Sequence, residues 1–267
     1  MYWLNGQLTD SVSLSDRSFQ YGDGCFTTML TIDGKIVHWD KHIQRMESCL
    51  NVLGIEIPNW HTVEAWLTQA IHSKGKAGVK LHISRGEGGR GYSPTQVTSP
   101  NVTISAFQFP SHYEQWCRDG IELGICEPRL GLNPLLAGHK HNNRLEQVLL
   151  KADIERQGFS DGVALDCQDH VIETTMANIF WLRDGILYTP ELSHAGVAGV
   201  MRRVIMSYAA EHSWQVVEGQ FTLEQLLNAD EVFISNSILG VAPIIAIGEQ
   251  RFSIGKLTRT IQETVLS

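Results

Sequence analysis

The sequence lacks the excess of basic residues that a nucleic-acid surface requires. Lysine and arginine number 21 against 29 aspartates and glutamates, so the 267-residue chain carries a formal net charge of −8. A protein that follows a phosphate backbone needs a basic footprint. The composition therefore excludes a nucleic-acid partner, although a few arginines or a helix N-terminus could still hold a small anion.

Long apolar runs and metal-binding spacings are also missing. No stretch approaches the roughly 20 apolar residues that span a bilayer, and no basic segment followed by an apolar one opens the chain. The five cysteines include no C-x-x-C pair, and the 11 histidines show no H-E-x-x-H pattern. Such reduced thiols are typical of a cytoplasmic protein. We expect a cytoplasmic location, no membrane partner and no metal.

Turn and cap signals mark the elements of the first part of the chain. Asp33-Gly34 predicts a tight hairpin turn, and Asp40 and Asn59 are expected to begin two helices. Strands are expected at 79–84 and 102–109, joined by a glycine-rich loop. The mixture of strands and helices favours an α+β fold.

Pro110–Gly120 is the expected boundary between two domains, residues 1–110 and 111–267. Beyond it, the helix after Lys140 carries apolar residues at helical spacing, and we expect them to face a core. The other expected elements of this part are hairpins around 167–170 and 184–185, a helix at 199–211, a capping box at Thr222 and Gln225, strands at 231–235 and 242–247, and a terminal helix. The apolar residues of the Lys140 helix are Leu145, Val148, Leu149 and Ala152.

Lys140 and Glu173 are the candidates for chemistry. Lys140 follows a glycine-containing loop, and Glu173 lies in an expected strand. A lysine amine can form a Schiff base with an aldehyde cofactor, and an acidic residue can keep a pyridine nitrogen protonated so that the ring accepts electrons. The pair suggests pyridoxal phosphate. Taken singly, the two are also compatible with an ordinary helix-start lysine and an ordinary strand glutamate.

The segment Gly86–Gly91 matches G-x-G-x-x-G after an expected strand. A dinucleotide-binding fold needs a helix to begin there, but Tyr92-Ser93-Pro94 predicts a loop, and no Gly-Lys-Ser/Thr ending supports a P-loop. Two interpretations stay open. The loop either carries Arg90 and Tyr92 over a ligand or is a plain hairpin connection.

Three segments offer contacts for a phosphate group. Arg45 lies on the polar side of the first helix, Gly199–Arg202 opens a later helix, and Ser235–Ser237 ends a strand with two hydroxyls. Helix N-termini present backbone N–H groups and a positive dipole end to anions. Each segment also has an ordinary interpretation, as a solvated arginine, a helix start or a polar turn.

Taken together and in this order, these segments resemble the fold-type IV pyridoxal-phosphate enzymes, which include branched-chain and D-amino-acid aminotransferases and aminodeoxychorismate lyases. The resemblance runs from about residue 1 to 250 and is strongest to the aminodeoxychorismate lyases. It is carried by Asp16–Thr28, His42–Met46, Ile83–Tyr92, Lys140 with Asn143–Leu149, Glu173 with Ala177–Phe180, Gly199–Arg202 and Ser235–Ser237.

The resemblance implies a D-amino-acid aminotransferase-like fold of two α/β domains, with pyridoxal 5'-phosphate in the interdomain cleft, in a homodimer. It implies that Lys140 is the Schiff-base lysine, that Glu173 contacts the pyridine nitrogen, and that Thr28 handles a proton near the reactive carbon. The residues implied for the cofactor phosphate are Arg45, the backbone of Val200 and Met201, and Ser237; those for the substrate are Arg90 and Tyr92.

For function, the resemblance implies a lyase that converts 4-amino-4-deoxychorismate to 4-aminobenzoate and pyruvate, a step of folate biosynthesis. An aminotransferase on the same cofactor is the alternative, and a non-catalytic cofactor-binding protein is a more distant one. Two residues depart from the family pattern. Met201 stands where many of the aminotransferases carry threonine, and Asn142 stands where an apolar residue is expected.

Overall fold

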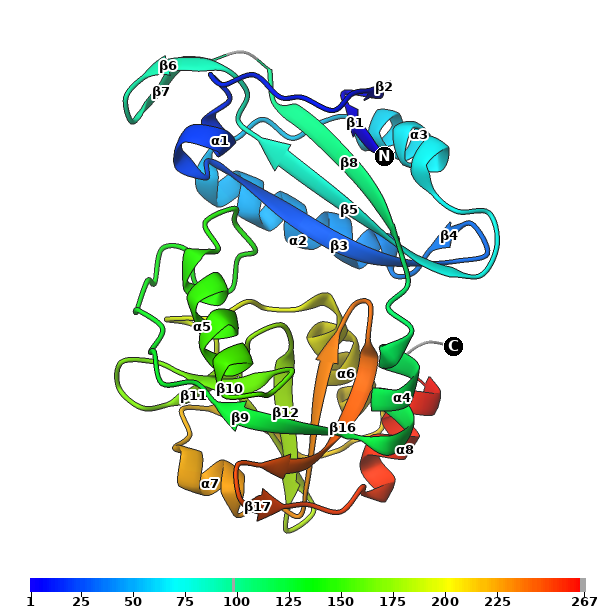
Figure 1. Ribbon diagram of the computed structural model, residues 1–267, viewed down its shortest axis with the longest axis vertical. Coiled ribbons are helices and arrows are strands. Elements are labelled where there is room, and N and C mark those ends of the chain that lie inside the picture. Colours follow the sequence, from blue (N-terminus) through cyan, green and yellow to red (C-terminus); the bar gives the residue numbers. More distant parts are fainter. Residues whose placement is uncertain (98, 265–267) are drawn as a thin grey trace. The chain divides into compact units, whose positions relative to one another are not determined.

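The computed structural model describes residues 1–97 and 99–264, and the chain forms two compact units (Figure 1). The first unit contains Met1–Phe109 and His139–Asn143, and the second contains Pro110–Gly138 and Arg144–Ser267. The expected division had placed Lys140 in the second domain. The short segment around Lys140 instead belongs to the first unit, because its backbone pairs with a strand there.

The first unit is built on a six-stranded antiparallel sheet with the strand order β2-β1-β8-β5-β3-β4. Helix α2 packs on β3 and α3 packs on β8, and together they cover a core that includes Met29, Leu50, Leu67 and Leu81. The strands are β1 (Tyr2–Leu4), β2 (Gln7–Leu8), β3 (Gly24–Ile32), β4 (Lys35–Ile36), β5 (Lys76–Ser84) and β8 (Asn101–Gln108), and the helices are α1 (Arg17–Tyr21), α2 (Trp39–Leu53) and α3 (Trp60–Ala70). A separate hairpin pairs β6 (Gly88–Arg90) with β7 (Ser93–Val97).

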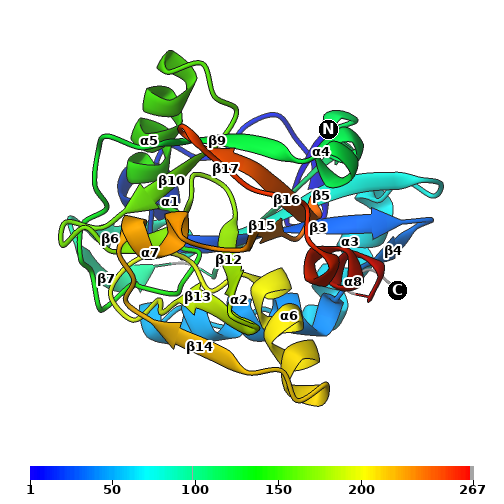
Figure 2. The same cartoon turned by 90° about the horizontal axis from the view of Figure 1, so that it is seen from below.

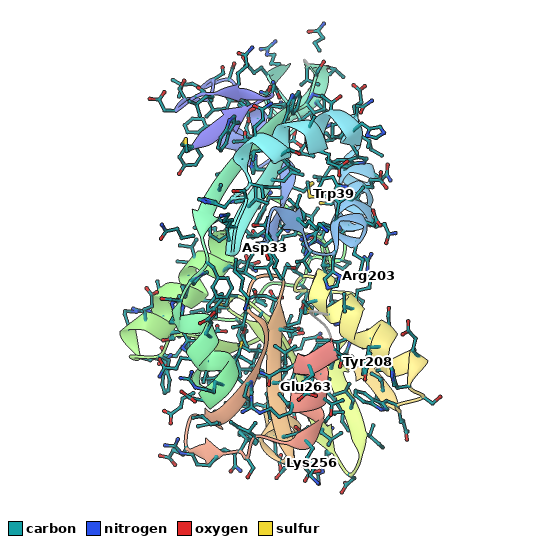
Figure 3. All side chains as sticks on the ribbon, turned by 90° about the vertical axis from the view of Figure 1, so that its right-hand side faces the viewer. Asp33, Trp39, Arg203, Tyr208, Lys256 and Glu263 are labelled. Carbon is teal, nitrogen blue, oxygen red and sulfur yellow. The ribbon has the colours of Figure 1, made fainter. Side chains whose placement is uncertain are left out.

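Local signals explain where these elements begin and end. Asp33 and Gly34 have φ angles of 47° and 80°, as the predicted hairpin turn between β3 and β4 requires. Asn59 accepts a hydrogen bond from the Thr62 N–H and caps α3, as predicted. The prediction for Asp40 is wrong, because α2 starts at Trp39 after a left-handed His38. Figure 3 labels Asp33, in the turn before β4, and Trp39, at the start of α2.

The second unit is built on a nine-stranded sheet that mixes parallel and antiparallel pairs in the order β11-β10-β9-β16-β15-β12-β13-β14, with β17 paired to β16. Its strands are β9 (Ile121–Ile125), β10 (Gly162–Leu165), β11 (Val171–Thr174), β12 (Asn178–Arg183), β13 (Ile186–Pro190), β14 (Val216–Gly219), β15 (Glu231–Asn236), β16 (Gly240–Ile247) and β17 (Gln250–Arg251). Its helices are α4 (His112–Asp119), α5 (Leu145–Arg156), α6 (Val200–Glu211), α7 (Leu223–Leu227) and α8 (Lys256–Thr264).

Alternating side chains of β12 and β15 divide the core of this unit between the two faces of the sheet. Phe180 and Phe233 stack with ring centroids 5.1 Å apart in the cluster that includes residues of α6 and α8. Trp181 and Val232 belong to the other cluster, which includes residues of α4 and α7. Figure 2 shows α6 and α8 on the same side of these strands, and Figure 3 labels Tyr208 on α6.

The second unit starts at Pro110, within one residue of the expected boundary, and α4 in this stretch packs Tyr113 and Trp116 against its core. One prediction for this unit needs correction. The residues predicted to bury α5 are exposed instead, with Leu145, Val148 and Leu149 at 71%, 59% and 55%. Leu150 and Ile154 form the buried face of this helix. Helical spacing identifies an apolar face but not the surface that covers it. The predicted capping box at Thr222 and Gln225 is confirmed.

No helix within residues 1–97 and 99–264 is both long and apolar enough to cross a membrane.

Candidate active site

The Lys140 segment pairs with the first residues of β3. Phe26 N–H donates to the Lys140 carbonyl at 3.0 Å, and Asn142 N–H donates to the Gly24 carbonyl at 2.9 Å. An isolated antiparallel bridge between Cys25 and His141 lies between these two hydrogen bonds. The segment thus continues the sheet at the edge of β3, and the position of its main chain is set by β3.

Several polar groups gather around the ring of Phe26. The ammonium nitrogen of Lys140 lies 4.7 Å from the ring centroid, and that of Lys80 lies 4.4 Å from it. Thr28 pairs with Lys80 across the strands, and Phe26 pairs with His82. Because side chains alternate along a strand, all four side chains of β3 and β5 project from one face. The structure therefore brings Thr28 and Lys140 to the same face of the first unit.

Burial changes the charge state of this face. Burial lowers the pKa of Lys80, and burial together with the Lys80 charge lowers the pKa of His82 to about 4. His82 is therefore neutral near pH 7. The sequence offered no signal for Lys80 as a member of this group, since its position depends on the register of β5 against β3.

Glu173 lies on β11 and is 7% exposed. Its Oε2 accepts a hydrogen bond from the Val197 N–H at 3.0 Å. Residues 196–198, which include Val197, also pair with Gly138. The Gly138 N–H donates to the Gly196 carbonyl at 3.0 Å, and the Gly138 carbonyl accepts from the Ala198 N–H at 2.9 Å. Lys140 follows Gly138 by two residues in the chain.

Asn178, at the start of β12, holds the residues that lead into α6. Its Oδ1 accepts from the Gly199 N–H at 3.1 Å, and its Nδ2 donates to the Val197 carbonyl at 2.8 Å. Gly199 provides no side chain to cap α6, and the first helical residues Val200 and Met201 are buried. The N–H groups of this first turn therefore suit an anion from outside the helix.

The end of β15 adds a buried hydroxyl to the same unit. Ser235 is 1% exposed and lies opposite Asn178 in the strand register. Within the described residues its Oγ has no hydrogen-bond partner. A buried hydroxyl without a partner is costly, so this oxygen suits a polar ligand. The predicted Ser237 lies just beyond, in the turn after β15, and is half-buried.

Arg45 lies on α2 and is 6% exposed. Its Nη2 donates to the Thr27 hydroxyl at 2.5 Å, and that oxygen also lies 2.6 Å from His42 Nδ1. Burial, followed by the charges of Arg45 and His38, holds the pKa of His42 well below its usual value. Thr27 and Thr28 project from opposite faces of β3. The structure therefore places this contact of Arg45 on the opposite face from Thr28.

Arg90 and Tyr92 lie on the β6–β7 hairpin and are exposed. Strand β7 follows the glycine-rich stretch, so the helix of a dinucleotide-binding fold is not there. Tyr92 packs edge-on against Tyr21 with centroids 5.6 Å apart. Arg17 donates to the carbonyls of Gly91 and Tyr92 at 3.1 and 3.3 Å, which holds the tip of the hairpin.

Comparison with known proteins decides the family. Residues 24–247 match the sequence model of the family described as amino-transferase class IV. The chain belongs to this family. An aminodeoxychorismate lyase of Vibrio harveyi is 54% identical over 98% of either chain.

Solved structures of class IV aminotransferase folds also match. The crystal structure of 4-amino-4-deoxychorismate lyase from Pseudomonas aeruginosa has a TM-score of 0.93 and 34% identity, with 99% of this chain and 98% of that chain covered. A hypothetical aminotransferase from Mycobacterium tuberculosis, in a PLP-bound form, has a TM-score of 0.84 and 16% identity, with 99% and 97% covered. These likenesses confirm the predicted α+β fold of fold-type IV.

Proposed function

We propose that this protein is a pyridoxal-phosphate-dependent lyase that converts 4-amino-4-deoxychorismate to 4-aminobenzoate and pyruvate, a reaction of folate biosynthesis. The observation that carries the proposal is the 54% identity, over 98% of the chain, to an aminodeoxychorismate lyase. Lys140 and Glu173 supply the two groups that distinguish a catalyst from a protein that merely binds the cofactor.

The residues present fit the cofactor. Lys140, whose side chain lies over Phe26, would hold its aldehyde through the neutral amine. Glu173, which accepts from the Val197 N–H, would keep a proton on the ring nitrogen. When bound, the cofactor supplies an aromatic ring that accepts the electrons of a broken C–H bond. The phosphate contacts proposed for this chain are the N–H groups of Val200 and Met201, Ser235 and Ser237. Arg45 is proposed as a further donor, although its Nη2 is bound to Thr27 on the other face of β3.

The side chains on the Phe26 face perform the proton chemistry. With substrate bound, the free Lys140 amine would take the proton from the substrate carbon that bears nitrogen. Thr28 holds a hydroxyl on the same face for proton handling. Expulsion of the enolpyruvyl ether then leaves an aromatic product, which makes the step strongly downhill. Arg90, with Tyr92 beside it, binds a substrate carboxylate.

Lys140 and Glu173 serve the same cofactor in this proposal. Both groups act on one ring, the lysine at its aldehyde and the carboxylate at its nitrogen.

The working unit is a homodimer. Leu145, Val148 and Leu149 form an exposed apolar stripe along α5, which we name the α5 stripe. Apolar stripes at i, i+3 and i+4 are normally covered by another surface. A second copy of the chain covers the α5 stripe in this proposal.

The protein acts in the cytoplasm, where thiols stay reduced. The cysteines are compatible with this, since no disulfide bond joins any two of them in the described residues. They are Cys25, Cys49, Cys117, Cys126 and Cys167.

A product assay without any keto-acid acceptor tests the proposal. A lyase returns the cofactor in its aldehyde form at each turnover, so pyruvate release from 4-amino-4-deoxychorismate should continue while the aldehyde absorbance persists. An aminotransferase half-reaction leaves the amine form and stops. Rapid conversion of the cofactor by leucine, glutamate or D-alanine, with no pyruvate from aminodeoxychorismate, would assign the chain to the aminotransferases.

The anchor is tested by borohydride reduction followed by peptide mapping. The pyridoxyl group should be found on Lys140, and Lys140→Ala should lose both the label and turnover. Lys80 is the matched alternative, because its amine lies over the same Phe26 ring. A label on Lys80 instead would overturn the assignment.

A further inference from the structure

Asn142 lies two residues after Lys140, where the resemblance implied an apolar residue, and the structure gives its amide a defined place. Its backbone N–H pairs with β3 at Gly24, and its side chain continues across β3. Nδ2 donates to the Ser18 hydroxyl at 2.8 Å and to the Ile83 carbonyl, on β5, at 3.3 Å. One side chain thereby joins the Lys140 segment to α1 and to the neighbouring strand.

Gly24 makes this crossing possible. A Cβ atom built at Gly24 would lie 2.5 Å from Asn142 Nδ2 and 2.1 Å from the Ile83 carbonyl oxygen. Both distances are far below a van der Waals contact. The space that a side chain at position 24 would fill is therefore occupied by the amide of Asn142.

The directions of these hydrogen bonds follow from the acceptors. A carbonyl oxygen only accepts, so the atom that faces Ile83 must be the Asn142 NH2 group. The Ser18 oxygen then accepts from Asn142 and is left with its own proton to donate. Its neighbour on the other side is His82 Nε2, at 3.2 Å. His82 is neutral and carries one ring proton, so Nε2 accepts from Ser18 when that proton is on Nδ1.

We infer that Asn142 is a positioning residue for Lys140, acting through the chain Asn142–Ser18–His82. The inference rests on the proposed role of Lys140 as the cofactor lysine. His82 lies opposite Phe26 in the strand register, and the Lys140 ammonium lies over Phe26. The network therefore fastens the Lys140 main chain to the face that carries its side chain.

An alternative is that the Asn142 side chain only fills space, as an apolar side chain of the same size would. Its Oδ1 argues against this, since the atom is buried without a hydrogen-bond partner in the described part of the chain. A half-satisfied amide costs stability relative to an apolar side chain of the same shape. The donor side of the amide has to offset that cost, and the bonds to Ser18 and Ile83 do so.

The test uses apoprotein with Asn142→Leu and Ser18→Ala. Asn142→Leu introduces an apolar residue of similar size. Ser18→Ala removes one oxygen from α1, near the surface. It provides a folded variant for the test even if Asn142→Leu unfolds. Asn143→Ala is the matched control, because it removes an amide bond of the same segment, to the Gly22 carbonyl, outside the network.

The first readout is the imidazole tautomer of His82, followed by nitrogen NMR of the apoprotein. Wild type and Asn143→Ala should show the Nδ1–H form. Ser18→Ala should show a mixture of tautomers, because His82 Nε2 loses its hydroxyl donor. Asn142→Leu should also show a mixture, because the Ser18 hydroxyl is no longer held in one direction. A purely space-filling Asn142 would leave the tautomer of His82 unchanged, since the two residues are not in direct hydrogen-bond contact.

The second readout is the rate at which apoprotein captures pyridoxal phosphate covalently at Lys140. Asn142→Leu should slow capture about tenfold, the effect of losing two neutral hydrogen bonds. The double variant with Ser18→Ala should capture the cofactor no more slowly than Asn142→Leu alone, because both substitutions interrupt the same Asn142–Ser18–His82 hydrogen-bond chain. Asn143→Ala should change the rate less than twofold.

The outcomes separate this inference from the proposed function. Normal capture by wild type, together with normal capture and an unchanged His82 tautomer in Asn142→Leu, would overturn the positioning role alone. Failure of wild-type protein to take label at Lys140 would overturn the proposed function, and with it the role of Asn142 toward a cofactor.

Discussion

Asp23→Asn should destabilise the first unit more than its exposure suggests. Asp23 Oδ2 lies 2.9 Å from Arg17 Nε and 2.7 Å from Arg85 Nε. The side chains of Arg17, Asp23 and Arg85 are 4%, 11% and 12% exposed. One carboxylate thus compensates two guanidinium groups that water hardly reaches.

The magnitude of the destabilisation follows from the two arginine charges that lose their carboxylate partner. Asparagine keeps the shape of the side chain but removes its charge, so Arg17 and Arg85 face each other as buried like charges. Removing one partner of a buried pair costs 3–5 kcal/mol, and the remaining exposure of Arg85 and Asp23 places this case near the lower end, at about 3 kcal/mol. A loss of this size is a large part of the stability of an ordinary domain.

Urea unfolding followed by tryptophan fluorescence measures the effect. Asp119→Asn is the matched control, because Asp119 pairs with Arg118 through side chains that are 50% and 71% exposed. That variant should unfold at the wild-type urea concentration. Equal urea midpoints for the two variants would refute the reasoning about the buried cluster.

The pH dependence supplies a second test with a defined sign. Burial alone would raise the pKa of Asp23, but the hydrogen bonds and charges of Arg85 and Arg17 together hold it below its usual value. The folded state therefore binds the proton less readily than the unfolded chain, whose aspartates have a pKa of about 3.9. The advantage of wild type over Asp23→Asn should be full near pH 7 and should shrink as the pH falls below about 4.

Two further predictions concern the proposed chemistry and assembly. Glu173→Gln keeps an oxygen for the Val197 N–H but loses the charge at the ring nitrogen, so single-turnover kinetics at full cofactor occupancy should slow by about 10²-fold; an undiminished rate would remove Glu173 from the mechanism. Val148→Glu should shift the protein from dimer to monomer in sedimentation velocity, whereas Glu155→Gln, outside the α5 stripe, should not; an unchanged dimer would place the subunit interface elsewhere.

The sequence predicted those features that depend on residues a few positions apart. Asp33-Gly34 makes its turn with its own backbone angles, and Asn59 and Thr222 cap helices through N–H groups three residues away. The sequence also proposes Lys140 and Glu173 as site residues, because aldehyde and pyridine chemistry require these residue types. Such features need no knowledge of the distant chain.

The tertiary structure decided what depends on strand register and on partner surfaces. Lys80 joins the Phe26 face because β5 pairs with β3 in one register, and a shift by one residue would turn it to the other face. The position of the Asn142 amide depends on the room that Gly24, which lacks a side chain, leaves for it. The spacing of Leu145, Val148 and Leu149 predicted an apolar stripe on α5 but not its exposure, because Leu150 and Ile154 face the core instead.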